Sequence, residues 1–256
     1  MPSKSSLVIF LHGIGASGEQ LMPLAASWRA SLPNTQFAAP DAPLPHRYGH
    51  QWFIAEGNPL DPTRIRTARE AFDGLMNDVV RAEGFADAHA RIAFVGLSQG
   101  SIVALDAVAS GRWRIGALVS FAGLLPPQQV SSASRDTPVL LVHGQRDTTI
   151  PATASTLAAA QLGAAGFKVE LEIEPGVGHT ISSSGAERAL TFLKQTLAGG
   201  AFPAVEHTYR GSDQDVDIGF WNIEWLANRY DQPAKLDGAV SQNTTTKLRG
   251  YRATMT

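Results

Sequence analysis

Ser98 lies in the pattern Gly-x-Ser-x-Gly, within the run Gly96-Leu97-Ser98-Gln99-Gly100. An apolar stretch typical of a buried strand precedes it, and an alanine- and valine-rich stretch typical of a helix follows it. A sharp strand-to-helix turn lifts such a hydroxyl above a sheet, while its glycines permit strain and close packing. The start of the helix also favours developing negative charge. We predict that Ser98 is a nucleophile; the alternative is an ordinary tight turn with a serine cap.

A serine nucleophile needs a general base, and after this kind of turn the chain order is Ser, then Asp or Glu, then His. Only His143, His179 and His207 follow Ser98. His143 ends an apolar strand, which favours a packed structural role, and His207 lies in a C-terminal region of different character. His179 lies in a glycine-containing loop between the last expected strand and the last expected helix. From there it can reach the carboxyl edge of a sheet, so we predict that His179 is the base.

Six carboxylates lie between Ser98 and His179, and their positions distinguish them. Asp147 follows a strand at the expected edge, where it would orient the imidazole and stabilise its charged form. Asp106 falls within the helix after Ser98, and Asp136 precedes a strand at the opposite edge. The remaining three alternate along a strand as on a half-solvated edge strand; they are Glu170, Glu172 and Glu174. We predict Asp147 as the acid, with a helix-capping turn aspartate as the alternative.

Acyl transfer also needs hydrogen-bond donors for the oxyanion of its tetrahedral intermediate. After such a turn, one donor is the amide that follows the nucleophile, and the other lies in the loop after the first strand. We assign these donors to the backbone amides of Gln99 and Ile14, the latter in His12-Gly13-Ile14-Gly15. This chemistry requires no metal and no organic cofactor, and we expect none.

The elements that would position these residues alternate along the chain. Strands are expected at residues 7–11, 36–39, 91–95, 115–121, 139–142 and 168–173, and helices at 63–79, 99–110, 151–165 and 186–197. Residues 40–62 contain five prolines and are expected to form an ordered loop. Strands that alternate with helices predict an α/β fold, with a mostly parallel sheet covered by helices on both faces.

Composition excludes several classes of protein. Of 256 residues, 44% are hydrophobic and 17% are charged, which rules out disorder throughout the chain. A net charge of −2 gives no electrostatic case for a nucleic-acid partner. The absence of cysteine excludes a disulfide scaffold, a thiolate metal site and a cysteine nucleophile. The first apolar run, at 7–11, is too short for a signal peptide or a membrane span, so we expect a cytoplasmic protein.

Several motifs, in order over residues about 5–198, resemble the phospholipase/carboxylesterase family of α/β-hydrolases, which includes carboxylesterases, lysophospholipases and acyl-protein thioesterases. The resemblance implies a triad of Ser98, Asp147 and His179, an oxyanion hole from the Ile14 and Gln99 amides, and a compact hydrolase without a large lid domain. The motifs are Phe-Leu-His-Gly-Ile-Gly at 10–15, Gln-Trp-Phe at 51–53, the Ser98 turn, His-Gly-Gln-Arg-Asp-Thr-Thr-Ile-Pro at 143–151 and Gly-His at 178–179.

The expected function is a serine carboxylesterase that hydrolyses short- to medium-chain acyl esters, small-molecule substrates, through an acyl-enzyme intermediate. Trp52, Phe53, Leu124 and Leu125 are the expected pocket residues, although Trp52 could equally pack under its own loop. Two alternatives within enzymes, an acyl thioesterase and a lysophospholipase, would use the same triad. The non-enzyme alternative is a binding or assembly module that acts through the C-terminal region; an intact triad argues against it.

The character of the sequence changes near residue 200. We expect residues 1–200 to form the catalytic domain and 201–256 a non-catalytic extension whose deletion leaves esterase activity in place. Residues 213–230 resemble the opening strand of the endonuclease/exonuclease/phosphatase superfamily, but Asn222 alone cannot hold magnesium. Four large apolar side chains predict docking on the catalytic domain or on a second subunit as a homodimer; they are Phe220, Trp221, Trp225 and Leu226.

Overall fold

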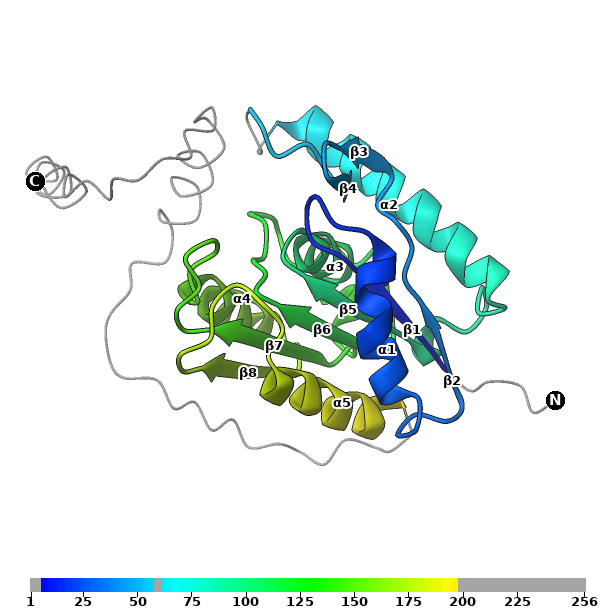
Figure 1. Cartoon of the computed structure of the whole chain (residues 1–256). Helices are drawn as coiled ribbons and strands as arrows, with labels where there is room; N and C mark the ends of the chain where they lie inside the picture. The colour runs from blue at the N-terminus through cyan, green and yellow to red at the C-terminus, as the bar shows by residue number, and fades with distance from the viewer. Residues whose placement is uncertain (1–5, 58–60, 198–256) are drawn as a thin grey trace, which may run out of the picture.

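The sheet at the centre of the molecule is six-stranded, and every neighbouring pair of strands in it is parallel (Figure 1). The computed structural model describes residues 6–57 and 61–197. The strand order is β2-β1-β5-β6-β7-β8, which confirms the predicted α/β fold with its parallel sheet. The strands are β1 (Ser6–Leu11), β2 (Thr35–Ala38), β5 (Ile92–Leu97), β6 (Ala117–Phe121), β7 (Val139–Gly144) and β8 (Val169–Glu174).

Helices cover both faces of this sheet, as predicted (Figure 1). Apolar side chains of α1 and α5 pack on one face, and those of α2, α3 and α4 pack on the other. The helices are α1 (Met22–Trp28), α2 (Pro62–Ala82), α3 (Gln99–Ala109), α4 (Thr153–Ala164) and α5 (Ser183–Leu197). Short 3₁₀ turns occur at Gly18–Leu21, His89–Arg91 and Ser132–Ser134.

The burial of each strand follows its place in the sheet. All residues of β1, β6 and β7 are buried, as expected for strands covered on both faces. In β8, at one edge, only the last residue is buried. Since β5 to β8 are parallel neighbours, their carboxyl ends meet at one edge of the sheet. The segments that follow β5, β7 and β8 carry Ser98, Asp147 and His179, respectively.

Two local predictions need correction. Residues 40–62 are not all loop, because β3 (Leu44–His46) and β4 (Gly49–Gln51) pair in an antiparallel ribbon. Pro45 is tolerated there because it faces His50, whose N–H and C=O bond to the loop after β1 instead, so the ribbon requires no N–H at Pro45. The short helix α1 was not expected from the sequence; Pro23 lies in its first turn, where its missing N–H costs nothing.

Several expectations fall outside the described residues. These are the boundary near 200, the docking of 201–256, the role of Asn222 and the homodimer. Within residues 6–57 and 61–197, no helix is long and apolar enough to cross a membrane. Within the same ranges, no group of three or more His, Cys, Asp or Glu side chains is placed to hold a metal ion.

Candidate active site

Ser98 occupies a strained turn between β5 and α3. Its φ of 54° and ψ of −117° are rare for a residue with a side chain, so the surrounding structure must enforce them. The flanking glycines allow this close approach. A Cβ on Gly100 would lie 2.1 Å from the Leu11 carbonyl oxygen, and one on Gly96 would lie 2.6 Å from the Ser101 amide nitrogen. The predicted turn is therefore present, and only glycine fits at these two positions.

The three residues predicted as a triad form one chain of hydrogen bonds. The Ser98 hydroxyl donates to His179 Nε2 over 2.9 Å, and His179 Nδ1 donates to Asp147 Oδ2 over 2.6 Å. The Asp147 side chain is fully buried, whereas the His179 side chain is 23% exposed. This geometry suits transfer of the serine proton to the imidazole, with the carboxylate fixing the tautomer.

Asp147 is held as an anion by donors on both of its oxygens. Oδ1 accepts from the amides of Thr149 at 2.7 Å and Ile150 at 2.9 Å, while Oδ2 accepts from His179. Burial by itself raises the pKa of Asp147, but the hydrogen bonds from His179, Ile150 and Thr149 outweigh it and lower that pKa below its ordinary value. The carboxylate is therefore ionised wherever the histidine can act as a base.

A second histidine, His143, also contacts Asp147. Its Nε2 lies 3.1 Å from Asp147 Oδ2 and 2.8 Å from the Ile150 carbonyl oxygen, so this nitrogen must carry the proton and donate. Burial lowers the pKa of His143, and its neutral Nδ1 accepts from the Ser155 hydroxyl at 2.7 Å. The sequence predicts a packed residue, and His143 is buried; its contact with the acid is not evident from the pattern. The spacing of four residues from Asp147 was the available signal.

The side chain of Gln99 fastens a neighbouring loop to the serine turn. Its Oε1 accepts from the Trp52 amide at 2.7 Å, and its Nε2 donates to the Phe53 carbonyl at 2.8 Å. The Trp52 indole in turn donates to the His12 carbonyl at 2.8 Å. Sequence reasoning considered only the backbone amide of Gln99, so this role of its side chain was missed.

The loop after β1 lies directly against the candidate nucleophile. A Cβ on Gly13 would lie 3.4 Å from Ser98 Cβ, so the adjacent Ile14 is near the turn. His12 anchors this loop, because its Nε2 accepts from the Ala42 amide at 2.9 Å and its Nδ1 donates to the Gly13 carbonyl at 2.7 Å. Gln99 is the first residue of α3, and the backbone amides in the first turn of a helix have no hydrogen-bond acceptor within that helix. The oxyanion role of the Ile14 and Gln99 amides stays a prediction.

An apolar pocket of about 240 Å³ lies between α2 and α3. Ser98 and His179 do not line it, but Ile102 does, one helical turn beyond Ser98, and its amide donates to the Ser98 carbonyl at 3.0 Å. Of the expected pocket residues, Phe53 and Leu124 line it. Trp52 and Leu125 do not: they are 1% and 2% exposed and pack in the core beside the sheet. Trp52 thus takes the alternative role, packing beneath its own loop.

Comparison with known proteins shows the family of this chain. The model of the phospholipase/carboxylesterase family matches residues 2–197. The chain belongs to this family. A probable carboxylesterase of Oryza sativa subsp. japonica is 28% identical over 209 residues, which cover 75% of this chain and 89% of the relative. An acyl-protein thioesterase 1 of Gibberella zeae is 24% identical over 220 residues, covering 75% of this chain and 91% of the relative.

A solved structure of similar sequence has the same fold. The crystal structure of esterase PE8 is 32% identical in sequence, with a TM-score of 0.65 over 77% of this chain and 97% of that chain. The phospholipase/carboxylesterase protein described here is therefore an α/β-hydrolase, and its family supports esterase or thioesterase activity.

Proposed function

We propose that this protein is a serine carboxylesterase that cleaves short- to medium-chain acyl esters through an acyl-enzyme. The observation that carries the proposal is the hydrogen-bonded chain from Ser98 through His179 to the buried Asp147, at 2.9 Å and 2.6 Å. One similar rice protein is named a probable inactive carboxylesterase, so membership of the family does not by itself support catalysis. The geometry of the three side chains does.

In the proposed reaction, Ser98 Oγ attacks the ester carbonyl carbon while His179 Nε2 accepts the hydroxyl proton. The Ile14 and Gln99 amides would stabilise the oxyanion, and the proton then passes to the departing alcohol. Water attacks the acyl-enzyme with His179 again as the base, which releases the carboxylic acid and restores Ser98. Asp147 stays ionised throughout and balances the charge on the imidazolium.

The pocket supports an acyl chain of modest length. Its volume of about 240 Å³ lies slightly below the range of about 300–1,000 Å³ that is typical of small-molecule sites. The apolar side chains that line it include Phe53, Ile102 and Leu124, which pack together. A single alkyl chain suits this space better than a two-chain lipid.

Initial rates of the full chain on p-nitrophenyl esters of increasing acyl length would test the proposal, with an acyl thioester and a lysophosphatidylcholine of matched chain. We expect ester turnover that Ser98→Ala lowers by roughly 10⁴-fold or more. Ser27→Ala is the matched control, because Ser27 is exposed and its hydroxyl donates only to the Leu24 carbonyl within α1, and it should leave the rate unchanged. Faster turnover of the thioester would favour the acyl-protein thioesterase alternative. No Ser98-dependent hydrolysis of any substrate would overturn the proposal.

A further inference from the structure

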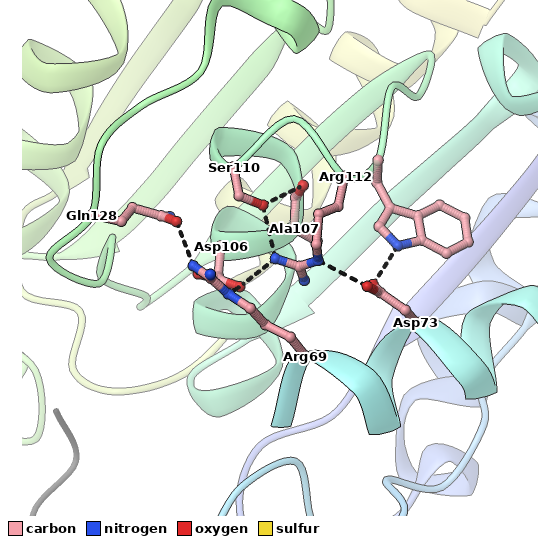
Figure 2. Close-up of polar contacts among 8 residues, drawn as sticks. Arg69, Asp73, Asp106, Ala107, Ser110, Arg112 and Gln128 are labelled. Carbon is pink, nitrogen blue, oxygen red and sulfur yellow. Dashed lines mark hydrogen bonds and ion pairs between the residues drawn. The ribbon is translucent and has the colours of Figure 1, made fainter. Parts of the chain in front are cut away.

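An ionic cluster of Arg69, Asp106 and Arg112 lines the apolar pocket at its end farther from Ser98 along α3 (Figure 2). Arg69 donates from Nε to Asp106 Oδ2 at 2.9 Å and from Nη2 to Asp106 Oδ1 at 2.6 Å. Arg112 donates from Nη1 to Asp106 Oδ2 at 2.8 Å. Its Nε donates to Asp73 on α2 at 2.9 Å. Charged groups in this number are unexpected at the end of a pocket that otherwise suits an alkyl chain.

The same three residues also belong to the wall of a second, more polar hollow between α2 and the segment at 126–128. The cluster therefore stands where the apolar pocket meets a polar one. The formal charges of the cluster balance, because Arg69 and Arg112 pair with the two carboxylates of Asp106 and Asp73. The side chains of Arg69 and Arg112 are nevertheless 32% and 23% exposed, so an anionic group that reached this end would meet two accessible guanidinium groups.

Gln128 adds a hydrogen-bond donor to the cluster. Its Oε1 accepts from Arg69 Nη2 at 2.8 Å, and a guanidinium can only donate, so the orientation of the amide is fixed (Figure 2). Gln128 lines the second hollow rather than the apolar pocket, and its Nε2 is then buried without a hydrogen-bond partner among the described residues. A buried donor without an acceptor is unfavourable, and an incoming acceptor would relieve it.

We propose that this cluster binds the terminal carboxylate of an acyl chain, so that the preferred substrates are monoesters of medium-chain dicarboxylic acids. The inference rests on the proposed esterase function and names the acyl group for the same site. From Ser98 to Asp106, α3 rises by about 12 Å. An extended chain covers roughly 1.2 Å per bond, so the seven bonds of an eight-carbon acyl group cover about 8 Å, and a hydrogen bond of about 3 Å to a guanidinium brings its reach close to this length.

The test compares kcat/KM for monomethyl suberate and methyl octanoate, which share chain length and leaving group and differ in the terminal carboxylate. Wild type at a pH where that carboxylate is ionised should prefer the suberate ester by roughly tenfold or more, as expected for a charge-assisted hydrogen bond. Gln128→Glu still accepts from Arg69 but removes the free donor and repels an anion, so it should lower the suberate-to-octanoate ratio by roughly tenfold or more. Gln129→Glu places the same charge on the neighbouring exposed residue and should keep the wild-type ratio.

The outcomes separate the two proposals. Octanoate hydrolysis with a suberate-to-octanoate ratio at or below one would overturn the inference and leave the esterase function standing. An equal ratio in Gln128→Glu and Gln129→Glu would also overturn it, because the preference would then arise elsewhere. If wild type hydrolyses neither these two esters nor the p-nitrophenyl series, the proposed function fails and the inference fails with it.

Discussion

His143 Nε2 lies 3.1 Å from Asp147 Oδ2, the same oxygen that accepts from His179 Nδ1 at 2.6 Å. The candidate acid is thus held between two imidazoles, one buried and one facing the candidate nucleophile. Since His143 is neutral and fixed by the Ile150 carbonyl and the Ser155 hydroxyl, it can restrain the carboxylate without competing for its charge. We therefore assign His143 a positioning role.

Replacing His143 should separate positioning from packing. His143→Leu removes the donor and should lower kcat by roughly 10–100-fold through misplaced Asp147 and His179, with little change in KM. His143→Gln retains a donor and should recover most of the lost kcat. Steady-state kinetics across pH, together with thermal unfolding, measure both effects. Equal losses in the two variants, or a change confined to KM, would contradict the role.

Asp147→Asn should strongly lower kcat, although the two side chains are nearly the same size. All four groups that contact the carboxylate are donors, from His143, His179, Thr149 and Ile150, so an amide NH₂ would face a donor wherever it points. The wrong histidine tautomer would also be favoured, and kcat should fall by roughly 10⁴-fold. The exposed Asp136→Asn serves as the control and should retain wild-type kcat. Activity of Asp147→Asn within tenfold of wild type would exclude Asp147 as the acid.

Stability should depend on pH through the two buried histidines. Burial lowers the pKa of both His12 and His143 in the folded chain, whereas each returns to about 6.5 on unfolding. Between these values the unfolded chain binds protons that the folded chain does not, so the free energy of unfolding rises with pH. The contribution of the two neutral histidines to the free energy of unfolding is fully present above pH about 6.5 and is lost as the pH falls below that value. Urea unfolding at several pH values should show this slope, and His143→Gln should make it shallower; an unchanged slope would contradict the assignment.

The turn at Ser98 should not tolerate an added methyl group at Gly100. Gly100→Ala places a Cβ 2.1 Å from the Leu11 carbonyl oxygen, which only backbone movement can relieve. We expect it to destabilise the fold by about 1–3 kcal/mol or more and to reduce activity. Gly74→Ala, in the middle of α2 with nothing within 4 Å of the new Cβ, should instead stabilise by roughly 0.5–1 kcal/mol. Thermal unfolding of both variants measures the contrast, and equal melting temperatures would refute it.

Much of the fold was predictable from the apolar runs and from the glycine and proline residues that separate them. The buried strands β1, β5, β6 and β7 are continuous apolar runs, and such runs need no tertiary information to recognise. The ribbon of β3 and β4 was missed because its pairing is held by the surrounding loops, as in the bond from the Gly15 amide to His50, rather than by any alternation of its own.

The candidate triad was predictable because parallel strands bring their carboxyl ends together, so the order of elements alone places Ser98, Asp147 and His179 at one edge. Contacts that depend on side-chain direction were not predictable. Whether Trp52 faced the pocket or the core depended on the bond between its indole and the His12 carbonyl, and the partner of Asp106 on α2, Arg69, lies 37 residues away in sequence. Periodicity contains no information about such long-range pairs.

Mass spectrometry of the acyl-enzyme, or of its stable phosphonate mimic, is the decisive measurement for the proposed chemistry. The full-length chain is treated with a fluorophosphonate, and the intact mass and the modified peptide are determined for wild type, Ser98→Ala and Ser27→Ala. The proposed mechanism predicts one adduct per chain, on Ser98, in wild type and Ser27→Ala, with none in Ser98→Ala. An adduct on another residue, or ester hydrolysis that persists in Ser98→Ala, would contradict it.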